Sequence, residues 1–138
     1  MPDRTRIPIN TRTYEEKYTR LRSEPSRRVS RSVLGTDLVN GYTTREQASL
    51  LLERLGLGAG DLLLDLGAGR AWPGSHLAAS SACRLVSSDL PMEALVTARD
   101  ALAAMSLAEP AMVLAADGSA LPFRDGVFDA VVHADVLC

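Results

Sequence analysis

Three aspartates are the residues whose type and spacing could do chemistry. Asp65, Asp89 and Asp117 each lie at or just after the end of a short apolar segment. Three carboxylates gathered in one crevice would attract a cation, repel a pyrophosphate and accept hydrogen bonds from hydroxyl and amino groups. These properties fit a nucleoside-bearing sulfonium. Asp89 could accept hydrogen bonds from both ribose hydroxyls, and Asp117 could accept one from the exocyclic amino group of adenine.

A glycine-rich turn follows the first of these aspartates. Gly67-Ala68-Gly69 stands two residues after Asp65, and residues without a Cβ let the backbone approach a ligand closely. Asp65 could orient this turn and reach the α-ammonium group of the ligand, directly or through water. The predicted ligand-binding residues are Asp65, Gly67, Ala68, Gly69, Asp89, Leu90, Asp117 and Gly118.

The elements that must position these residues alternate between strands and helices. Apolar runs bounded by glycine or aspartate predict strands over 62–66, 84–88, 112–115 and 128–132. Helical periodicity predicts helices over 44–55, 74–80 and 91–107, the first starting with the capping-box pattern Thr43-x-x-Glu46. This alternation is typical of an α/β fold. We expect a Rossmann-like doubly wound parallel sheet, incomplete, whose first four strands have the order 3-2-1-4, with the acids at one crevice.

The first forty residues differ from the rest in charge. Residues 1–31 hold nine of the fifteen Lys and Arg residues but only four acids, and the remainder is acidic. We therefore divide the chain into a basic polar arm over 1–40, with a short helix at Tyr14–Leu21, and a ligand-binding domain over 41–138. The arm could act as a lid, be a solvated terminus, or touch nucleic acid or membrane. It carries no nucleic-acid-binding motif, so nucleic acid is not the expected partner.

Several classes of protein are disfavoured by the sequence. The net charge of −2 does not suit a binder of polyanions, and no apolar run reaches the roughly 18 residues of a membrane span. The first thirty residues lack the apolar stretch of a signal peptide. Cys83 and Cys138 are far apart and have no metal-ligand spacing. We expect reduced thiols, no metal site and a cytoplasmic location.

Four segments resemble the motifs of class I S-adenosylmethionine (SAM)-dependent methyltransferases, most closely the type 11 group. Residues 62–69 resemble motif I, and Ser88-Asp89-Leu90 resembles the acidic end of the second strand. Residues 116–123 are similar to the family's D-x-x-x-L-P-F segment, and 125–132 to its D-x-x-F-D-x-V segment. The match covers about residues 42–138, and four motifs in order are more specific than any one.

The resemblance implies that SAM is the cofactor and that a methyl group passes to a small-molecule acceptor. It gives neither the acceptor, nor the methylated atom, nor the oligomeric state. The family fold continues for roughly another hundred residues, so we expect a chain truncated after the fourth strand, with that strand as an exposed apolar edge. A non-catalytic SAM-binding fragment is the main alternative. An NAD(P)-binding oxidoreductase is disfavoured, because Trp72 stands where the G-x-G-x-x-G pattern needs its third glycine.

Other residues near the motifs have alternative, structural or unassigned roles. His133, near the carboxyl end of the fourth strand, is a weak candidate for a general base. Trp72 could hold a sulfonium by cation–π attraction or pack as a lid on the glycine turn. Asp129 and His76 are expected to be structural. Asp135 and Cys138 lie on the predicted acceptor side without an assigned role.

Overall fold

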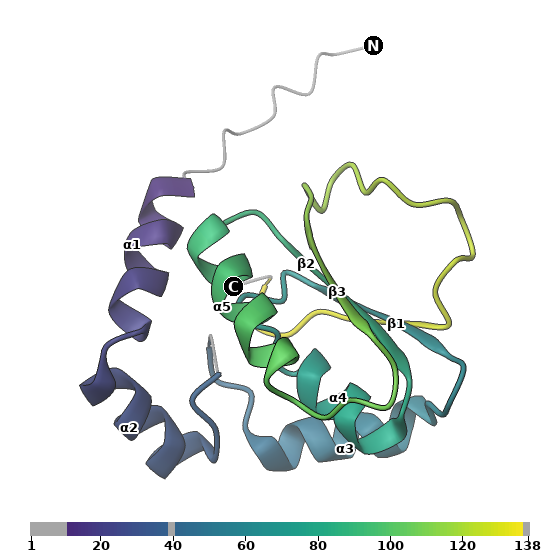
Figure 1. Cartoon of the computed structure of the whole chain (residues 1–138), viewed down its shortest axis with the longest axis horizontal. Coiled ribbons are helices and arrows are strands. Elements are labelled where there is room, and N and C mark those ends of the chain that lie inside the picture. The colour runs from purple at the N-terminus through teal and green to yellow at the C-terminus, as the bar shows by residue number, and fades with distance from the viewer. Residues whose placement is uncertain (1–10, 39–40, 137–138) are drawn as a thin grey trace.

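The computed structural model describes residues 11–38 and 41–136. Cys138 and the first ten residues of the predicted arm lie outside the described residues. Five helices and four strands follow one another along this part of the chain (Figure 1). They are α1 (Thr11–Leu21), α2 (Glu24–Leu34), α3 (Arg45–Leu55), β1 (Leu62–Leu66), α4 (Gly74–Ser81), β2 (Arg84–Asp89), α5 (Met92–Ala103), β3 (Ala111–Ala115) and β4 (Ala130–Val132).

The four strands form one parallel sheet with the order β3-β2-β1-β4. The predicted order 3-2-1-4 is therefore confirmed, as is the α/β class. Strand β1 occupies the centre because Leu63 and Leu64 are both buried, so both of its faces are apolar. The connections after β1 and β2 run through α4 and α5, whereas the β3–β4 connection is a wide loop (Figure 1).

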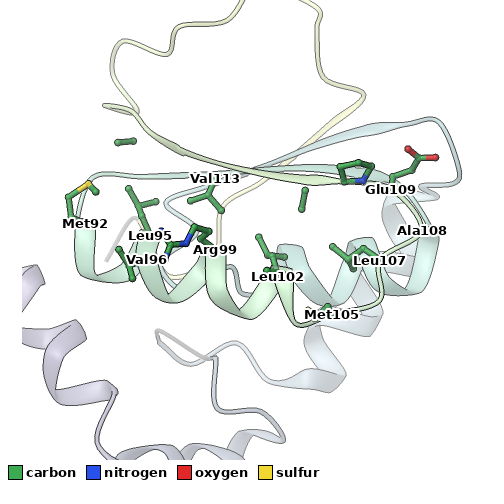
Figure 2. A pocket seen from close by; sticks show the side chains of 14 residues that line it. Met92, Leu95, Val96, Arg99, Leu102, Met105, Leu107, Ala108, Glu109 and Val113 are labelled. Atoms are coloured by element: carbon green, nitrogen blue, oxygen red, sulfur yellow. The ribbon is translucent and has the colours of Figure 1, made fainter.

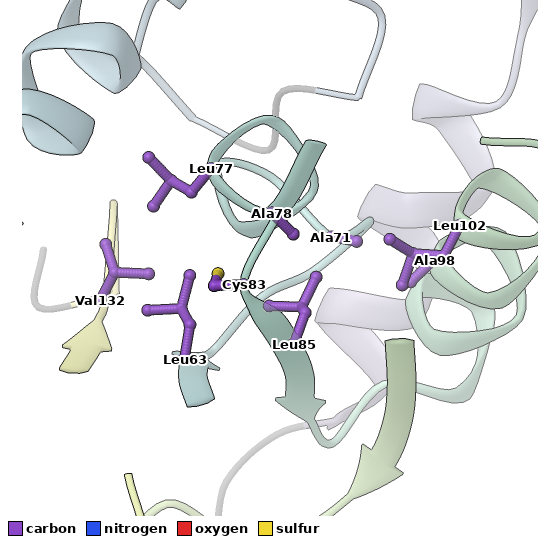
Figure 3. Packing of buried hydrophobic residues seen from close by; sticks show 9 residues of the cluster. All are labelled: Leu63, Ala71, Leu77, Ala78, Cys83, Leu85, Ala98, Leu102 and Val132. Carbon is purple, nitrogen blue, oxygen red and sulfur yellow. The ribbon is translucent and has the colours of Figure 1, made fainter. Parts of the chain in front are cut away.

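The core lies between one face of the sheet and the helices α4 and α5. Leu63 and Leu85 are register partners on that face, and Val132 of β4 joins them (Figure 3). Helix α4 packs on β1 and β2, α5 packs on β2 and β3, and α3 covers α4. The buried cluster comprises Leu63, Ala71, Leu77, Ala78, Cys83, Leu85, Ala98, Leu102 and Val132. This packing fixes the strand ends that carry the predicted site.

The other face of the sheet is apolar but less covered. Leu64 and Val86 are buried there, whereas Met112 and Val131 on the outer strands are 58% and 49% exposed. These four residues are neighbours in register, so they form one continuous surface. Within the described residues, β4 is an edge strand, as predicted for an incomplete sheet.

Helix α3 begins one residue later than the sequence pattern indicated. Thr44 is its N-cap, and the capping box joins Thr44 to Gln47 rather than Thr43 to Glu46. Both threonines have an acceptor side chain three residues ahead, so local sequence does not separate the two registers. Thr43 is used elsewhere, because its hydroxyl donates to Asp135 at 2.9 Å.

Two other element boundaries were predicted too generously. Helix α5 ends at Ala103, and Met105 and Leu107 reach the core from the turns that follow rather than from the helix. Strand β4 begins at Ala130 instead of residue 128. Phe128 instead packs edge-on against Phe123 in the preceding loop, with ring centroids 4.8 Å apart. In both places side-chain burial is achieved without regular backbone structure.

The described part of the N-terminal arm is mostly helical, which corrects the prediction of a single short helix at 14–21. Helix α2 was missed, although Pro25 lies in its first turn and Gly35 ends it with φ +77°. Helix α1 packs against α5 and α2, beside the sheet domain (Figure 1). None of the helices in residues 11–38 and 41–136 is both long and apolar enough to cross a bilayer.

Candidate functional site

The glycine turn after β1 is held by the end of β2. The amides of Gly67 and Ala68 both donate to the carbonyl of Ser88, at 2.8 and 3.0 Å. Gly67 has φ +69° and Gly69 has φ +54°, a region where a side chain is strained. The backbone path therefore requires glycine at these two positions.

Asp65 lies beneath this turn and is only 1% exposed. Its Oδ2 accepts the amide hydrogen of Gly74 at 2.8 Å, so the carboxylate caps the start of α4. Its Oδ1 is buried and has no hydrogen-bond partner among the described residues, and the same is true of the hydroxyl of Ser87, its register partner on β2. Such unpaired acceptors in a buried place are suited to a ligand cation or a water molecule.

The charge state of Asp65 is sensitive to its surroundings. Burial raises the pKa of Asp65 to about 7, with a further increase from the Asp89 charge and a decrease from the Gly74 hydrogen bond. A cation bound nearby would favour the ionised carboxylate and lower this pKa again. The two acids are thus close enough to interact, as predicted for residues of one crevice.

Asp89 connects the end of β2 to the glycine turn. Its Oδ2 accepts the amide hydrogen of Gly69 at 2.7 Å, and its Oδ1 accepts that of Leu90 at 2.8 Å. Burial raises the pKa of Asp89, while these two hydrogen bonds and Lys17 lower it. A carboxylate offers about four lone-pair directions. Two of these directions are used, so the two oxygens together can accept two further hydrogen bonds, for example from the hydroxyls of a ribose.

The amide donors of the glycine turn are already used within the protein. Gly67 and Ala68 donate to Ser88, Gly69 donates to Asp89, and the first amide of α4 donates to Asp65. A dinucleotide site needs such amides for its pyrophosphate at the helix N-terminus. Here that position holds a carboxylate, which would repel phosphate. The geometry therefore favours a cationic ligand over a dinucleotide.

Asp117 and Gly118 lie at the start of the β3–β4 loop. Asp117 Oδ1 accepts from the amide and the hydroxyl of Ser119, at 2.8 and 2.7 Å, which forms a local turn. The amide of Ala116 donates to the Asp89 carbonyl at 3.0 Å, so this loop starts beside the end of β2. A Cβ added to Gly118 would lie 3.4 Å from Leu66 Cδ1. The loop thus reaches the carboxyl end of β1, at the predicted crevice.

Trp72 and His76 form a packed pair beside α3, with Trp72 against Ala48, Leu34 and Leu38. Trp72 is 4% exposed, and its indole Nε1 donates to the Thr43 carbonyl at 2.9 Å. The rings of Trp72 and His76 are 5.7 Å apart, and His76 Nε2 is 3.1 Å from the Ser49 hydroxyl. Burial lowers the pKa of His76. Of the two roles considered for Trp72, its contacts with Ala48, Leu34 and Leu38 support packing, and His76 has the structural contacts expected of it.

Two other acids have structural contacts. Asp129 Oδ2 accepts the Leu62 amide hydrogen at 2.8 Å, and its own amide donates to the Leu62 carbonyl, so it holds the start of β4 as predicted. Asp135, which had no predicted role, accepts three hydrogen bonds from residues 42 and 43. His133 is exposed between them. Only a contact far apart in sequence explains Asp135, so the sequence offered no signal for it.

The N-terminal helices reach the crevice through residues that the sequence did not single out. Tyr18 is 5% exposed, and burial followed by the Asp89 charge raises its pKa. Glu15 accepts the amide hydrogens of Met92 and Glu93 at 2.7 and 3.0 Å, which caps α5 from another helix. Arg70, 2% exposed, donates to the Leu21 carbonyl at 3.4 Å. The arm is therefore docked beside Asp89.

A separate apolar groove lies between α5 and β3 (Figure 2). It has a volume of about 680 Å³ and is lined by residues that include Leu95, Leu102 and Val113. None of the predicted ligand-binding residues lines it. Among the residues of 11–38 and 41–136, no group of three His, Cys, Asp or Glu side chains is arranged to hold a metal ion.

Comparison with solved structures places this arrangement in a known fold. A SAM-dependent methyltransferase from Thiobacillus denitrificans in complex with S-adenosylhomocysteine has a TM-score of 0.63 and 20% identity, over 78% of this chain and 42% of that one. Phosphoethanolamine N-methyltransferase 2 from Haemonchus contortus, in complex with SAM, has a TM-score of 0.70 and 16% identity, over 91% and 29%.

A structure of a different activity is also similar. The [4+2]-cyclase SpnF has a TM-score of 0.58 and 27% identity, over 62% of this chain and 32% of that one. The chain thus spans less than half the length of each of these three structures. No curated protein sequence matches the chain significantly.

The family itself is given by a sequence profile. The type 11 profile, described as a methyltransferase domain, matches residues 64–138, which is more than half of the chain. The match begins within β1 and includes the glycine turn, Asp89 and Asp117. This chain belongs to the type 11 family of methyltransferase domains.

Proposed function

We propose that the chain binds SAM in the acidic crevice at the carboxyl edge of the sheet and forms the cofactor-binding part of a methyltransferase. The observation that carries this proposal is the glycine turn whose amides are satisfied internally by Ser88, Asp89 and Asp65. Such a turn presents carboxylates rather than amide donors, which suits a cationic nucleoside. Membership of a methyltransferase family supports the same conclusion.

Each part of SAM would have a matching group in the crevice. Asp89 would accept hydrogen bonds from the ribose hydroxyls, and Asp117 would accept one from the exocyclic amine. Leu90 and Gly118 would flank the adenine. The methionine end would pass over Gly67, Ala68 and Gly69. Asp65 Oδ1, a buried acceptor without a described partner, would receive the α-ammonium directly or through water. This unpaired buried oxygen of Asp65 supports the fit of SAM to the crevice independently of the family match.

The chemistry divides between cofactor and protein. SAM supplies an activated methyl group on a sulfonium, which leaves as a neutral thioether. The chain's own residues bind and orient the adenosine and methionine ends and exclude water from the crevice. The acceptor is proposed to be a small molecule. If the acceptor is protonated, His133 is the candidate base in this part of the chain, since it is exposed just after β4.

The N-terminal helices are proposed to cover the adenosine side of the crevice. Tyr18 is buried near Asp89, and Glu15 anchors α1 to the start of α5, which follows Asp89 directly. Removal of residues 1–34 should therefore weaken ligand binding, provided that circular dichroism shows the remaining domain folded. Unchanged affinity in a folded truncation would show that the arm is not a cover.

A second candidate is a SAM-binding domain that does not transfer methyl groups. The [4+2]-cyclase at 27% identity favours this alternative, because a protein of this fold catalyses another kind of reaction. A non-catalytic fragment belongs to the same class. Both alternatives keep the proposed binding site and differ only in the fate of the methyl group. Detection of S-adenosylhomocysteine as a product during incubation with candidate acceptors separates them from a methyltransferase.

Calorimetric titration with S-adenosylhomocysteine (SAH), with NAD as the comparison ligand, tests the binding proposal. We expect micromolar binding of SAH and no binding of NAD. Asp89→Ala should reduce SAH affinity by roughly ten- to a hundredfold, because a charge-assisted contact of about 1.5–3 kcal/mol is lost.

Asp129→Ala is the matched control for Asp89→Ala. Asp129 also accepts a backbone amide hydrogen, but at the opposite end of β1 from the glycine turn. This variant should lower stability and leave SAH affinity unchanged. NAD binding equal to that of SAH, or an Asp89→Ala variant with wild-type affinity, would contradict the proposed site.

A further inference from the structure

The segment after β4 is joined to the segment before α3 by one carboxylate. Asp135 Oδ2 accepts the amide hydrogens of Tyr42 and Thr43, at 3.0 and 3.1 Å, and the Thr43 hydroxyl hydrogen at 2.9 Å. The residues lie more than ninety positions apart in the sequence. Three donors on one charged oxygen make a specific clamp rather than a chance surface contact.

The two segments also touch closely at Gly41. A Cβ added to Gly41 would lie 2.5 Å from both Cβ and Cγ of Asp135, a distance that no side chain could occupy. Asp135 itself has φ +59°, an uncommon value for a residue other than glycine. Strained backbone of this kind persists when the surrounding contacts hold it, and here those contacts are the clamp.

The clamp contacts the glycine turn on two sides. On one side, the Thr43 carbonyl accepts the indole hydrogen of Trp72 at 2.9 Å, and the Trp72 amide donates to the carbonyl of Ala68 in the turn at 3.2 Å. On the other side Val136, the next residue after Asp135, lies directly against Gly67. A Cβ added to Gly67 would be 2.6 Å from Val136 Cγ2. Asp135 thus fixes two side chains that flank the turn over which the methionine end of SAM is proposed to pass.

We propose that Asp135 is a positioning residue that holds Val136 and Trp72 against the glycine turn and so shapes the methionine end of the cofactor crevice. This inference rests on the proposed function. It extends that function because the hydrogen bonds of Asp135 described above go to Tyr42 and Thr43, and these residues are outside the set proposed for adenosine. Loss of the clamp should affect only the part of the ligand that extends beyond the ribose.

The test compares SAH with adenosine, which lacks the homocysteine end, on four chains: wild type, Asp135→Ala, Asp135→Asn and Thr43→Val. Calorimetry gives the SAH affinity and competition gives the adenosine affinity. Asp135→Ala should weaken SAH about tenfold, the loss of roughly one charge-assisted hydrogen bond. Adenosine affinity should stay unchanged. Asp135→Asn keeps an acceptor, so its SAH affinity should lie between those of the wild type and Asp135→Ala. Thr43→Val removes only the hydroxyl donor and should weaken SAH least.

Asp125→Ala, on the exposed β3–β4 loop, is the control for a lost acidic side chain and should bind both ligands normally. Equal weakening of SAH and adenosine in the Asp135 and Thr43 variants, or no weakening of SAH, would overturn the positioning role. If Asp135→Ala does not fold, the milder pair Asp135→Asn and Thr43→Val decides by the same criterion. A folded wild-type chain that binds neither ligand would instead refute the proposed function, and this inference with it.

Discussion

The two ends of the proposed crevice are built differently. At the methionine end, Asp65, Trp72 and Asp135 connect β1, the glycine turn, α4 and the segment before α3 through hydrogen bonds between distant residues. At the adenine end, Asp117 is held by a turn within its own loop, through Ser119. Hydrogen bonds that join several different elements preorganise a site, whereas a turn held within a single exposed loop leaves it adjustable. We therefore expect the methionine end to be preformed and the adenine end to change conformation when the ligand binds.

The largest effect should come from filling the space at the preformed end. Gly67→Ala places a methyl group 2.6 Å from Val136 in a residue with φ +69°, so both the backbone and the neighbouring side chain must move. SAH binding should become undetectable by calorimetry.

Gly126→Ala is the matched control, since its φ is +71° but nothing lies within 4 Å of the added Cβ. It should cost only the left-handed backbone penalty of about 1–2 kcal/mol in stability, measured by urea unfolding. Equal effects of the two variants on SAH affinity would show that the contact with Val136 does not matter, and the contrast between the ends would be lost.

Asp65 gives the preformed end a dependence on pH. Its folded-state pKa of about 7 lies above the ordinary value of 3.8, so the folded state holds a proton that the unfolded state releases. The free energy of unfolding should therefore fall as pH rises from about 4 through about 7, and level off above that. The α-ammonium group of SAH, proposed to bind Asp65, favours the ionised carboxylate, so SAH affinity should rise about tenfold between pH 6 and pH 8.

Asp65→Asn removes this titration while keeping an acceptor for the Gly74 amide. Calorimetry at pH 6, 7 and 8 should show SAH affinity rising more steeply with pH for the wild type than for the variant. Asp89, whose pKa is also raised by burial, would produce a residual slope shared by both chains. Identical slopes in the two proteins would assign the pH dependence to Asp89 and remove Asp65 from the account.

The smallest effect is expected at the adjustable end. Asp117→Ala should weaken SAH only by roughly three- to tenfold, because one of its carboxylate oxygens already serves Ser119 and the loop can compensate. The preference for SAH over its inosine analogue, which lacks the exocyclic amine, should disappear in the variant. If Asp117→Ala lost as much affinity as Gly67→Ala, or kept the full preference, the proposed adenine contact would be wrong.

The sheet could be predicted from the sequence because its signals are local. Apolar runs and the glycine turn fix β1 and its neighbours, and the alternation with helices fixes the order of strands. Local signals gave the wrong N-cap for α3, because a contact with a distant residue determines it. Thr43 and Thr44 are equivalent as N-caps until Asp135 engages Thr43, more than ninety residues away.

The N-terminal helices show a different limit. Helix α2 has Pro25 in its first turn and Gly35 after its end, so both of its boundaries could be predicted from the sequence. Its apolar residues after Pro25 are Val29, Val33 and Leu34, and none of its side chains is buried, so little of a core-facing pattern marked the helix itself. Contacts of the arm such as Glu15 at the start of α5 and Tyr18 near Asp89 depend on how it docks. Sequence patterns do not encode that placement, and these residues were found only in the folded chain.

The most direct test of the account is amide chemical-shift mapping of the isotopically labelled chain during titration with SAH. The account predicts changes clustered at Gly67–Gly69, at Asp89 and Leu90, and at Asp117 and Gly118, with the largest line-shape changes in the β3–β4 loop. The rival location is the apolar groove between α5 and β3. Changes confined to Leu95, Leu102 and Val113 in that groove, with an unaffected glycine turn, would contradict the proposed cofactor site.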